Sequence, residues 1–430
     1  MLASCGGNPA PTSSASTVPS EPSTPSQPST PAEIDLEAII DSITDQEDMD
    51  LLVWCAEEIL PTVTNTVNDF VDDISEYYEG EINVTLNAVG EGTAATNMVT
   101  DVESGADVYF FAQDQLARLN TAGALAEVPN LFATKIRNEN SAGSVGAGTL
   151  NDKLIAYPAT EDNGYYLYYD KSVLSEEDIK DWETIIAKAE AQEKEVDINY
   201  TSAWYNFGFF YGAGADSVWS TNAAGSFVSY NDTYDQEVGL VAARAMANII
   251  TSGRVVDNSG VSGTGDNCIA LVDGAWDYGA AVDKWGDNLG CAELPSYTVG
   301  GKKYHTGSFS GNKLIGVKPQ VSEARSVITQ LIGLELNSYE AQDARYDAKG
   351  WGPCNKELVA SEKIQAAPHL QALVAQNAYA KPQGQFPGKW WDLAGAIGSS
   401  VKAAGKDATD DDLQGILDLY HASLDSCLDA

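Results

Sequence analysis

Leu51-Leu52-Val53-Trp54-Cys55 opens the pattern that decides the fold of this chain. A short, continuous apolar run of this kind is typical of a strand buried on both faces of a parallel sheet. Apolar residues at helical spacing follow from Val67 to Tyr78, and Gly80 is the predicted end of that helix. Strand-like runs recur at residues 82–86 and 107–111. This strand–helix–strand–helix–strand order predicts a parallel sheet covered by helices on both faces.

The rest of the chain alternates in the same way. Strands are expected at 153–158 and 165–169, and helices at 175–191, 322–348 and 358–380. The sequence contains no internal repeat of the length found in solenoids or propellers. Because 430 residues give room for two domains, we expect an α/β protein of one large unit or two.

The charge balance excludes several classes of partner. Asp and Glu number 63 against 24 Lys and Arg, which gives a net charge of -39. Such a field repels phosphate backbones, so we expect no nucleic-acid partner, and it also disfavours anionic substrates. Neutral or cationic ligands remain open. The sequence has no apolar run long enough to span a membrane.

The N-terminus resembles a bacterial lipoprotein signal. Leu2-Ala3-Ser4-Cys5 is similar to a lipobox, in which a peptidase cuts before the cysteine and a diacylglycerol is attached to its thiol. The Pro/Ser/Thr-rich stretch after it is typical of an extended, solvated spacer. We therefore predict a lipobox remnant at 1–5, lipid attachment at Cys5, and a linker at 6–46. Because a secretory signal needs a basic and an apolar segment before the cysteine, the chain as written is not expected to be lipidated.

The other cysteines and the histidines do not form a metal-binding pattern. No two of the five remaining cysteines lie within four residues of each other, so no zinc-type spacing occurs. We expect mostly buried, reduced thiols, and neither a metal nor a cofactor. The five cysteines are Cys55, Cys268, Cys291, Cys354 and Cys427, and the three histidines are His305, His369 and His421.

Acidic residues follow two of the predicted strands. Glu57 and Glu58 come after the first strand, and Asp114 and Gln115 come after the third. In open α/β sheets, ligands bind beyond the carboxyl ends of the strands. These side chains are therefore candidate ligand contacts, and the alternative that they are ordinary solvated loop residues stays open.

Aromatic clusters point to a carbohydrate ligand. Flat aromatic faces pack against the apolar faces of sugar rings, while carboxylates and amides bind the hydroxyls. Trp390 and Trp391 follow a Gly/Pro-rich loop and would point about 100° apart on a helix, so one can be buried while the other faces a cleft. The other clusters are Tyr109–Phe111, Tyr165–Tyr169, Trp204–Tyr211 and Trp276 with Tyr278; most of these residues are expected to lie in the core, and we assign Tyr168, Phe209 and Phe210 to it.

Catalytic signatures are weak. Gly307 to Gly311 superficially resembles the esterase motif, but Phe309 occupies the nucleophile position. The acidic run Asp410 to Asp412 is more simply the start of a helix. A glycosidase needs only two carboxylates, so a sequence with 63 acidic residues leaves that activity open.

From Asp50 to the C-terminus the chain resembles the maltose/maltodextrin-binding branch of the extracellular solute-binding proteins, in particular the lipoproteins of Gram-positive bacteria. The segments that carry the resemblance occur in the family's order. They are Gly105–Leu116, Gly123–Leu125, Leu154–Pro158, Tyr168–Lys171, Ala270–Trp276, Trp351–Lys356 and Trp390-Trp391.

The resemblance implies a two-lobed α/β fold of the maltose-binding-protein type, each lobe a mostly parallel sheet flanked by helices, with the ligand cleft between the lobes. The N-terminal lobe would comprise 47–160 and 306–356, and the C-terminal lobe 161–305 and 357–430. The implied function is that of a non-enzymatic, monomeric receptor. It would be lipid-anchored at the outer face of the cell membrane. There it would bind maltose or maltooligosaccharides and deliver them to an ABC permease.

The resemblance also assigns site residues by position. The aromatic side chains would stack on glucose rings, and the acidic ones would bind hydroxyls. Departures at Phe111, Gln115 and Glu57-Glu58, where the enteric family member has Trp, Arg and Lys, put the preferred chain length and linkage in doubt. The assigned residues are Glu57, Glu58, Phe111, Asp114, Asp162, Asn163, Trp204, Tyr205, Trp276, Trp390 and Trp391.

Three alternatives remain. The chain is a receptor for another neutral oligosaccharide, an exported glycan-degrading enzyme, or a stalked adhesion module for insoluble starch. The aromatic content fits all of them.

Overall fold

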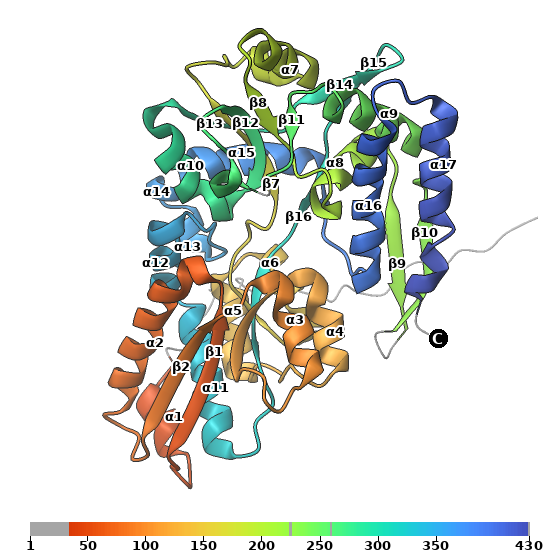
Figure 1. The fold of residues 1–430 in the computed structure, drawn as a ribbon. Helices are drawn as coiled ribbons and strands as arrows, with labels where there is room; N and C mark the ends of the chain where they lie inside the picture. The colour runs from red at the N-terminus through yellow and green to blue at the C-terminus, as the bar shows by residue number, and fades with distance from the viewer. Residues whose placement is uncertain (1–33, 223–225, 259, 429–430) are drawn as a thin grey trace, which may run out of the picture. The chain divides into compact units, whose positions relative to one another are not determined.

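Two five-stranded sheets, each flanked by helices, organise the chain into two lobes (Figure 1). The computed structural model describes residues 34–222, 226–258 and 260–428. The predicted α/β class with two sheet-and-helix lobes is confirmed. The predicted lipid attachment at Cys5 and most of the predicted linker lie outside the described residues.

The first-lobe sheet has the strand order β2-β1-β3-β17-β6. Strand β1 pairs in parallel with β2 and β3, as predicted, but β17 pairs antiparallel with both β3 and β6. The sheet is therefore mixed, because β17 re-enters this lobe from the second lobe and runs in the opposite direction. The strands are β1 (Met49–Cys55), β2 (Ile82–Ala88), β3 (Val108–Ala112), β6 (Tyr157–Pro158) and β17 (Lys313–Val317).

Helices cover both faces of this sheet. Leu52, Trp54, Tyr109 and Phe111 face α3 and α4 and share a core cluster with them. Helices α2 and α11 pack on the opposite face, where Val53 is fully buried. The helices of this lobe are α1 (Leu36–Asp41), α2 (Leu60–Ile74), α3 (Glu91–Thr100), α4 (Leu116–Thr121), α5 (Asn130–Glu139), α6 (Ala142–Ala147), α11 (Glu323–Leu336) and α12 (Tyr339–Lys349).

The second-lobe sheet has the order β11-β8-β12-β7-β13 and is also mixed. Strand β8 is parallel to β11 and β12, whereas β7 is antiparallel to β12 and β13. The five strands are β7 (Tyr165–Asp170), β8 (Glu195–Asp197), β11 (Val255–Val256), β12 (Cys268–Gly274) and β13 (Leu289–Ala292). Smaller pairs are β4 (Thr149–Leu150) with β5 (Lys153–Leu154), β9 (Ser217–Thr221) with β10 (Phe227–Asp232), β14 (Ser296–Val299) with β15 (Lys302–His305), and β16 (Ser308–Ser310) with β18 (Ala380–Pro382).

Alternate residues of β7 point into two different cores. Tyr165, Leu167 and Tyr169 pack with α7, α8, α9 and α16, while Tyr166 and Tyr168 pack toward α10 and α15. The assignment of Tyr168, Phe209 and Phe210 to the core is confirmed, since each is at most 1% exposed. The helices are α7 (Trp182–Ala191), α8 (Ala203–Ala213), α9 (Glu237–Ile250), α10 (Tyr278–Trp285), α13 (Lys356–Val359), α14 (Glu362–Gln365), α15 (Pro368–Gln376), α16 (Gly388–Ala404) and α17 (Asp410–His421).

Two predicted boundaries shift. The compact unit begins at Asp35, and Ile40 of α1 is fully buried, so the segment predicted as the end of the linker belongs to the folded body. Phe309 of β16 lies in the core cluster of the second lobe, so we place the return to the first lobe after Ser310 rather than at residue 306.

Several predicted helices differ in extent. Helix α2 ends at Ile74, six residues before Gly80. The segment 322–348 contains two helices, because Ser338 caps the backbone N–H of Ala341 and starts a new one. The segment 358–380 is divided among α13, α14 and α15, and α7 begins only at Trp182, where Asp181 is the cap. The prediction for 410–412 is confirmed: these residues form the acidic first turn of α17, with Thr409 and Asp412 in a capping box.

The five cysteines of the described part are free thiols, and all but Cys291 are buried. Burial raises the pKa of the Cys55 thiol to about 12, which makes it unreactive at neutral pH. In the described ranges, none of the helices has the length and apolar character needed to cross a bilayer.

Candidate ligand-binding cleft

A cavity of about 410 Å³ lies between the two lobes. Segments that follow strands β1, β2 and β3 form its first-lobe wall, and three tryptophans of the second lobe line the other wall. The lining residues are Glu58, Glu91, Gly92, Ala112, Asp114, Gln115, Asn163, Trp204, Trp276, Lys313, Gln383 and Trp391.

Three acidic residues converge on this cavity because neighbouring parallel strands end at the same edge. Glu58 lies in the 3-10 turn after β1, Glu91 is the first residue of α3 after β2, and Asp114 lies in the 3-10 turn after β3. Since β2, β1 and β3 are adjacent and parallel, their carboxyl ends bring these side chains together.

Burial makes two of these carboxyl groups unusually weak acids. It raises the pKa of Glu91 to about 7, an effect that nearby Lys313 partly offsets. Burial also raises the pKa of Asp114 to about 7, against partial offsets from backbone and Gln383 hydrogen bonds. Near neutral pH each group can therefore accept or donate a hydrogen bond, which suits a ligand rich in hydroxyls.

Aromatic rings form the opposite wall. Trp204 of α8 stacks on Phe309, with ring centroids 5.0 Å apart and an interplanar angle of 20°. Trp391 of α16 lies 6.3 Å from Trp204, measured between ring centroids. Both side chains are only partly buried, so they present apolar area to the cavity. Faces of this kind can pack against sugar rings.

Trp276 packs on Gly274, the last residue of β12, which lies two positions before it in the chain. A Cβ atom at Gly274 would lie 2.2 Å from atoms of the Trp276 ring, so the indole rests directly on the glycine backbone. Any larger residue at position 274 would push the ring away from this position. The local sequence Gly274-Ala275-Trp276 thus aims the side chain toward the first lobe.

Six of the residues predicted to bind ligand come together in this cavity. They come from both lobes and from the segment that joins them, and Asn163 donates a hydrogen bond of 3.1 Å from Nδ2 to Oε1 of Gln383. The six are Glu58, Asp114, Asn163, Trp204, Trp276 and Trp391.

The predictions for Phe111 and Trp390 are corrected by burial. Phe111 is fully buried in the first-lobe core, because it faces α3 and α4 rather than the cleft edge of β3. Trp390 is fully buried in the second lobe, where its indole N–H donates to the hydroxyl of Tyr420 at 2.9 Å. As the helical geometry predicted, one member of the Trp390-Trp391 pair is buried and the other faces the cleft.

Three further predicted residues lie near the cavity without lining it. Glu57 is exposed on the outer side of its turn. Tyr205 donates its hydroxyl to Oδ1 of Asp273 at 2.9 Å, which supports the end of β12 behind Trp276. Asp162 is 1% exposed and accepts a hydrogen bond of 2.5 Å at Oδ2 from the backbone N–H of Gly352. Asp162 and Tyr205 are therefore structural supports of the cleft in this arrangement.

Sequence reasoning missed three polar or charged lining residues: Glu91, Lys313 and Gln383. Glu91 follows β2. The expectation that ligands bind beyond the carboxyl ends of strands, which selected Glu58 and Asp114, would therefore also have selected Glu91. Gln115 was noticed at a strand end, and here its amide donates to the Gly92 carbonyl and accepts from Ala95 N–H. Nothing local in the sequence marks Lys313 or Gln383, because only the tertiary fold brings them to the cleft.

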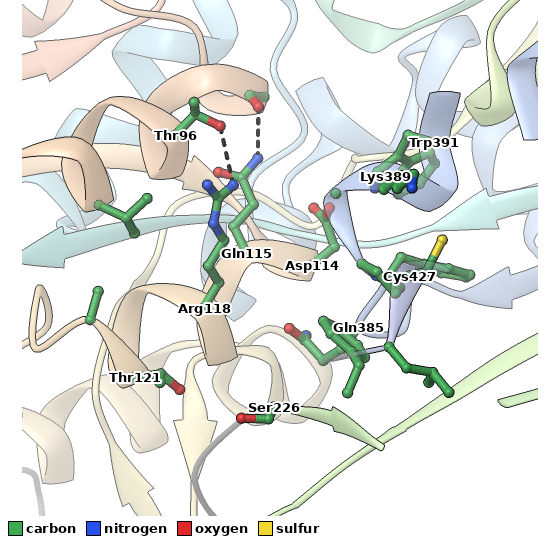
Figure 2. Close-up of a pocket in the computed structure, with 18 of the residues that line it drawn as sticks. Thr96, Asp114, Gln115, Arg118, Thr121, Ser226, Gln385, Lys389, Trp391 and Cys427 are labelled. Carbon is green, nitrogen blue, oxygen red and sulfur yellow. Dashed lines mark hydrogen bonds between the residues drawn. The ribbon is translucent and has the colours of Figure 1, made fainter. Parts of the chain in front are cut away.

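A wider groove of about 900 Å³ adjoins the cavity and shares Gly92, Asp114, Gln115 and Trp391 with it. Figure 2 shows Asp114, Gln115 and Arg118 on the first-lobe side, with Lys389, Trp391 and Cys427 facing them from the second lobe. Arg118 is exposed on the groove wall, where it donates a hydrogen bond of 3.1 Å to the hydroxyl of Thr96. The cavity therefore continues into a groove lined by both polar and apolar side chains.

Within the part of the chain that the structure describes, no cluster of His, Cys, Asp or Glu has the arrangement of a metal site.

Residues 73–372 match the family described as bacterial extracellular solute-binding protein. Solved structures agree in fold. One described as a complex with acarbose has a TM-score of 0.76 and 23% identity, covering 88% of this chain and 99% of its own. The maltodextrin-binding protein MalE1 from L. casei BL23, without ligand, has a TM-score of 0.70 and 22% identity over the same shares. The maltose-maltodextrin binding protein of Alicyclobacillus acidocaldarius has a TM-score of 0.68 and 16% identity, covering 87% and 100%. These likenesses confirm the predicted maltose-binding-protein type of fold. No sequence among the curated proteins matches the chain significantly.

Proposed function

The chain belongs to the bacterial extracellular solute-binding proteins, and from that premise we propose that it binds maltose or maltooligosaccharides in the cleft between its lobes. It then delivers them to the transmembrane subunits of an ABC permease. In this role it carries out no chemistry on the sugar.

The observation that carries this proposal is the composition of the two cleft walls. One wall holds Glu58, Glu91 and Asp114, and the other holds Trp204, Trp276 and Trp391. A sugar ring has flat apolar faces and a polar edge, so it is the ligand class that uses both walls at once. The adjoining groove gives room for a chain longer than a disaccharide.

The solved structures of similar fold support α-linked glucans as the ligand. Their descriptions name acarbose, maltodextrin and, for a cyclo/maltodextrin-binding protein at 18% identity, maltotetraose. We carry this ligand class over to the present chain on the strength of the cleft walls described above.

We further propose that the native protein is a monomer held at the outer face of a Gram-positive cell membrane through a lipid on Cys5. The Pro/Ser/Thr-rich stretch would then act as a spacer that lets the receptor reach its permease. Two acyl chains are enough for stable anchoring.

Titration with maltotriose while tryptophan fluorescence is recorded tests the ligand assignment. We expect a saturable change in intensity or wavelength, because Trp204, Trp276 and Trp391 line the cavity. An unchanged spectrum at millimolar maltotriose, combined with a change for another neutral oligosaccharide, would replace maltooligosaccharides by that sugar.

The second candidate function is that of a glycan-degrading enzyme, because several carboxyl groups gather in the cleft and a glycosidase needs two of them. Prolonged incubation with maltoheptaose separates the two functions. A receptor leaves the sugar intact, whereas an enzyme releases new reducing ends. An adhesion module would instead be pulled down by starch granules while binding short oligomers weakly.

A further inference from the structure

Lys313 is a buried cation that lines the cleft in addition to the acidic and tryptophan side chains. Its side chain is only 5% exposed, yet it lines the cavity. It is the first residue of β17 and lies opposite Ala112 of β3, at the cleft edge of the first-lobe sheet. Among the described residues that line this cavity, Lys313 is the only cationic one.

Two indole rings and one carboxylate partly stabilise the positive charge of the buried Lys313 ammonium. Its Nζ lies 3.8 Å from the ring centroid of Trp351 and 5.4 Å from that of Trp276, within the range of cation–π attraction. The nearest carboxylate oxygen is Oδ1 of Asp162 at 3.6 Å, which is too far for a hydrogen bond. These contacts offset the charge but do not use the N–H donors.

The N–H donors of Lys313 are therefore available to a ligand. Within the described residues, Nζ has no hydrogen-bond partner, and neither does Oε1 of Glu91, although both atoms are buried. A buried donor and a buried acceptor without partners are each costly in a protein interior. Lys313 and Glu91 both line the same cavity, so a ligand entering it can satisfy both.

We propose that Lys313 determines specificity by donating a hydrogen bond from its ammonium to a sugar hydroxyl, while Glu91 accepts one from the same or an adjacent hydroxyl. This inference rests on the proposed function. A hydroxyl both accepts and donates, so a neutral polyol satisfies the two groups together. An anionic ligand would be repelled by Glu58, and a cationic ligand would be repelled by Lys313.

The test compares Lys313→Met with Lys318→Met, using maltotriose and a set of maltotriose analogues that each lack one hydroxyl. Lys318 is the matched control, because it is also largely buried but follows the far end of β17, where its Nζ donates to the Gly105 carbonyl at 2.8 Å. Methionine keeps the length of the lysine stem without the charge. Calorimetry gives the affinities, and thermal unfolding shows whether each variant folds.

We expect Lys313→Met to bind maltotriose roughly tenfold or more weakly, the size of one hydrogen bond to a charged group, and Lys318→Met to bind as the parent does. We also expect one deoxy analogue that the parent rejects and Lys313→Met tolerates. Unchanged affinity in Lys313→Met, or equal weakening for every analogue, would overturn the inference while leaving the sugar receptor intact.

A parent protein that binds no maltotriose at all would overturn the proposed function, and with it this role for Lys313. If Lys313→Met does not fold, Glu91→Gln tests the same pair from the other side. That variant is expected to lose discrimination against the same deoxy analogue or its neighbour, and retained discrimination against both would contradict the pairing.

Discussion

Trp390 and Trp391 are neighbours in the chain but have different surroundings. Helix geometry turns consecutive side chains by about 100°, so one indole packs against Phe386 and Tyr420 while the other faces the cavity. The same reasoning separates Glu57, which is exposed, from Glu58, which lines the cleft. The direction in which a side chain points, rather than its residue type, therefore decides whether it can bind a ligand.

We therefore expect Trp391→Ala mainly to weaken sugar binding and Trp390→Ala mainly to lower the stability of the fold. We expect Trp391→Ala to bind maltotriose about tenfold or more weakly with little loss of stability, because a partly exposed stacking face is removed. Trp390→Ala should lose about 3–5 kcal/mol of unfolding free energy, because it empties a fully buried site. Calorimetry and urea unfolding measure the two effects, and equal stability losses would show that the assigned orientations are wrong.

The raised pKa values of Glu91 and Asp114 also predict how stability depends on pH. In the folded protein both carboxyl groups hold a proton up to about pH 7, whereas their ordinary pKa values are 4.5 and 3.8. The folded state thus binds more protons between these limits, so its extra stability is present at low pH and is lost as pH rises through 7.

We expect the unfolding free energy of the parent to fall between pH 5 and pH 8 and the fall to be smaller in a Glu91→Gln, Asp114→Asn double variant. Urea unfolding at both pH values measures this difference. An identical pH dependence in parent and variant would show that the two groups titrate normally.

At the scale of elements, α16 connects the second-lobe core to the cleft. The helix carries Trp391 near its start and packs through glycines against the segment 200–203. A Cβ atom at Gly398 would lie 1.8 Å from the Tyr200 carbonyl oxygen, so only glycine permits this approach. The position of Trp391 therefore depends on a residue more than a helical turn away from it.

Gly398→Ala should displace α16, lower stability by about 1–3 kcal/mol and weaken sugar binding. The matched control is Gly415→Ala on α17, where an added Cβ meets no atom within 4 Å. That change should raise stability by up to about 1 kcal/mol, since alanine favours the helix. If Gly398→Ala were as stable as Gly415→Ala, the close packing of α16 would be disproved.

The sequence predicted elements better than their pairing partners or ends. The apolar run 51–55 was sufficient to place β1. The expectation that ligands bind beyond strand ends selected Glu58, Asp114 and Gln115, but it also selected Glu57, which is exposed. The antiparallel β17 was not predictable from local pattern, because its partner β3 lies some 200 residues earlier in the chain and only the return from the second lobe sets its direction. Lys313 was missed for the same reason. Phe111 was assigned to the cleft by the resemblance alone, and the sequence could not correct this because a fully apolar strand does not reveal which face each residue occupies.

At the scale of the whole molecule, side chains from one lobe reach the other beside the cleft. The amide of Gln385, from the segment before α16, accepts from Ala117 N–H at 3.3 Å and donates to the Gln113 carbonyl at 3.2 Å. A ligand held between the lobes would favour this arrangement over a more open one, to the extent that it binds the closed form more tightly.

Gln385→Ala removes both of these hydrogen bonds and should shift the free protein toward a more open arrangement. We expect a larger radius of gyration without sugar, a return to the parent value at saturating maltotriose, and a modestly weaker affinity. Small-angle X-ray scattering with and without sugar measures this, and an unchanged radius in all four samples would contradict motion between the lobes.

Calorimetric titration of the parent protein with each oligomer from maltose to maltoheptaose is the most direct test of its function as a maltooligosaccharide receptor. We expect this function to give saturable binding of one sugar per chain for at least one oligomer, with the sugar recovered intact afterwards. Absence of binding heat for every oligomer, at several temperatures and with the protein shown to be folded, would contradict it.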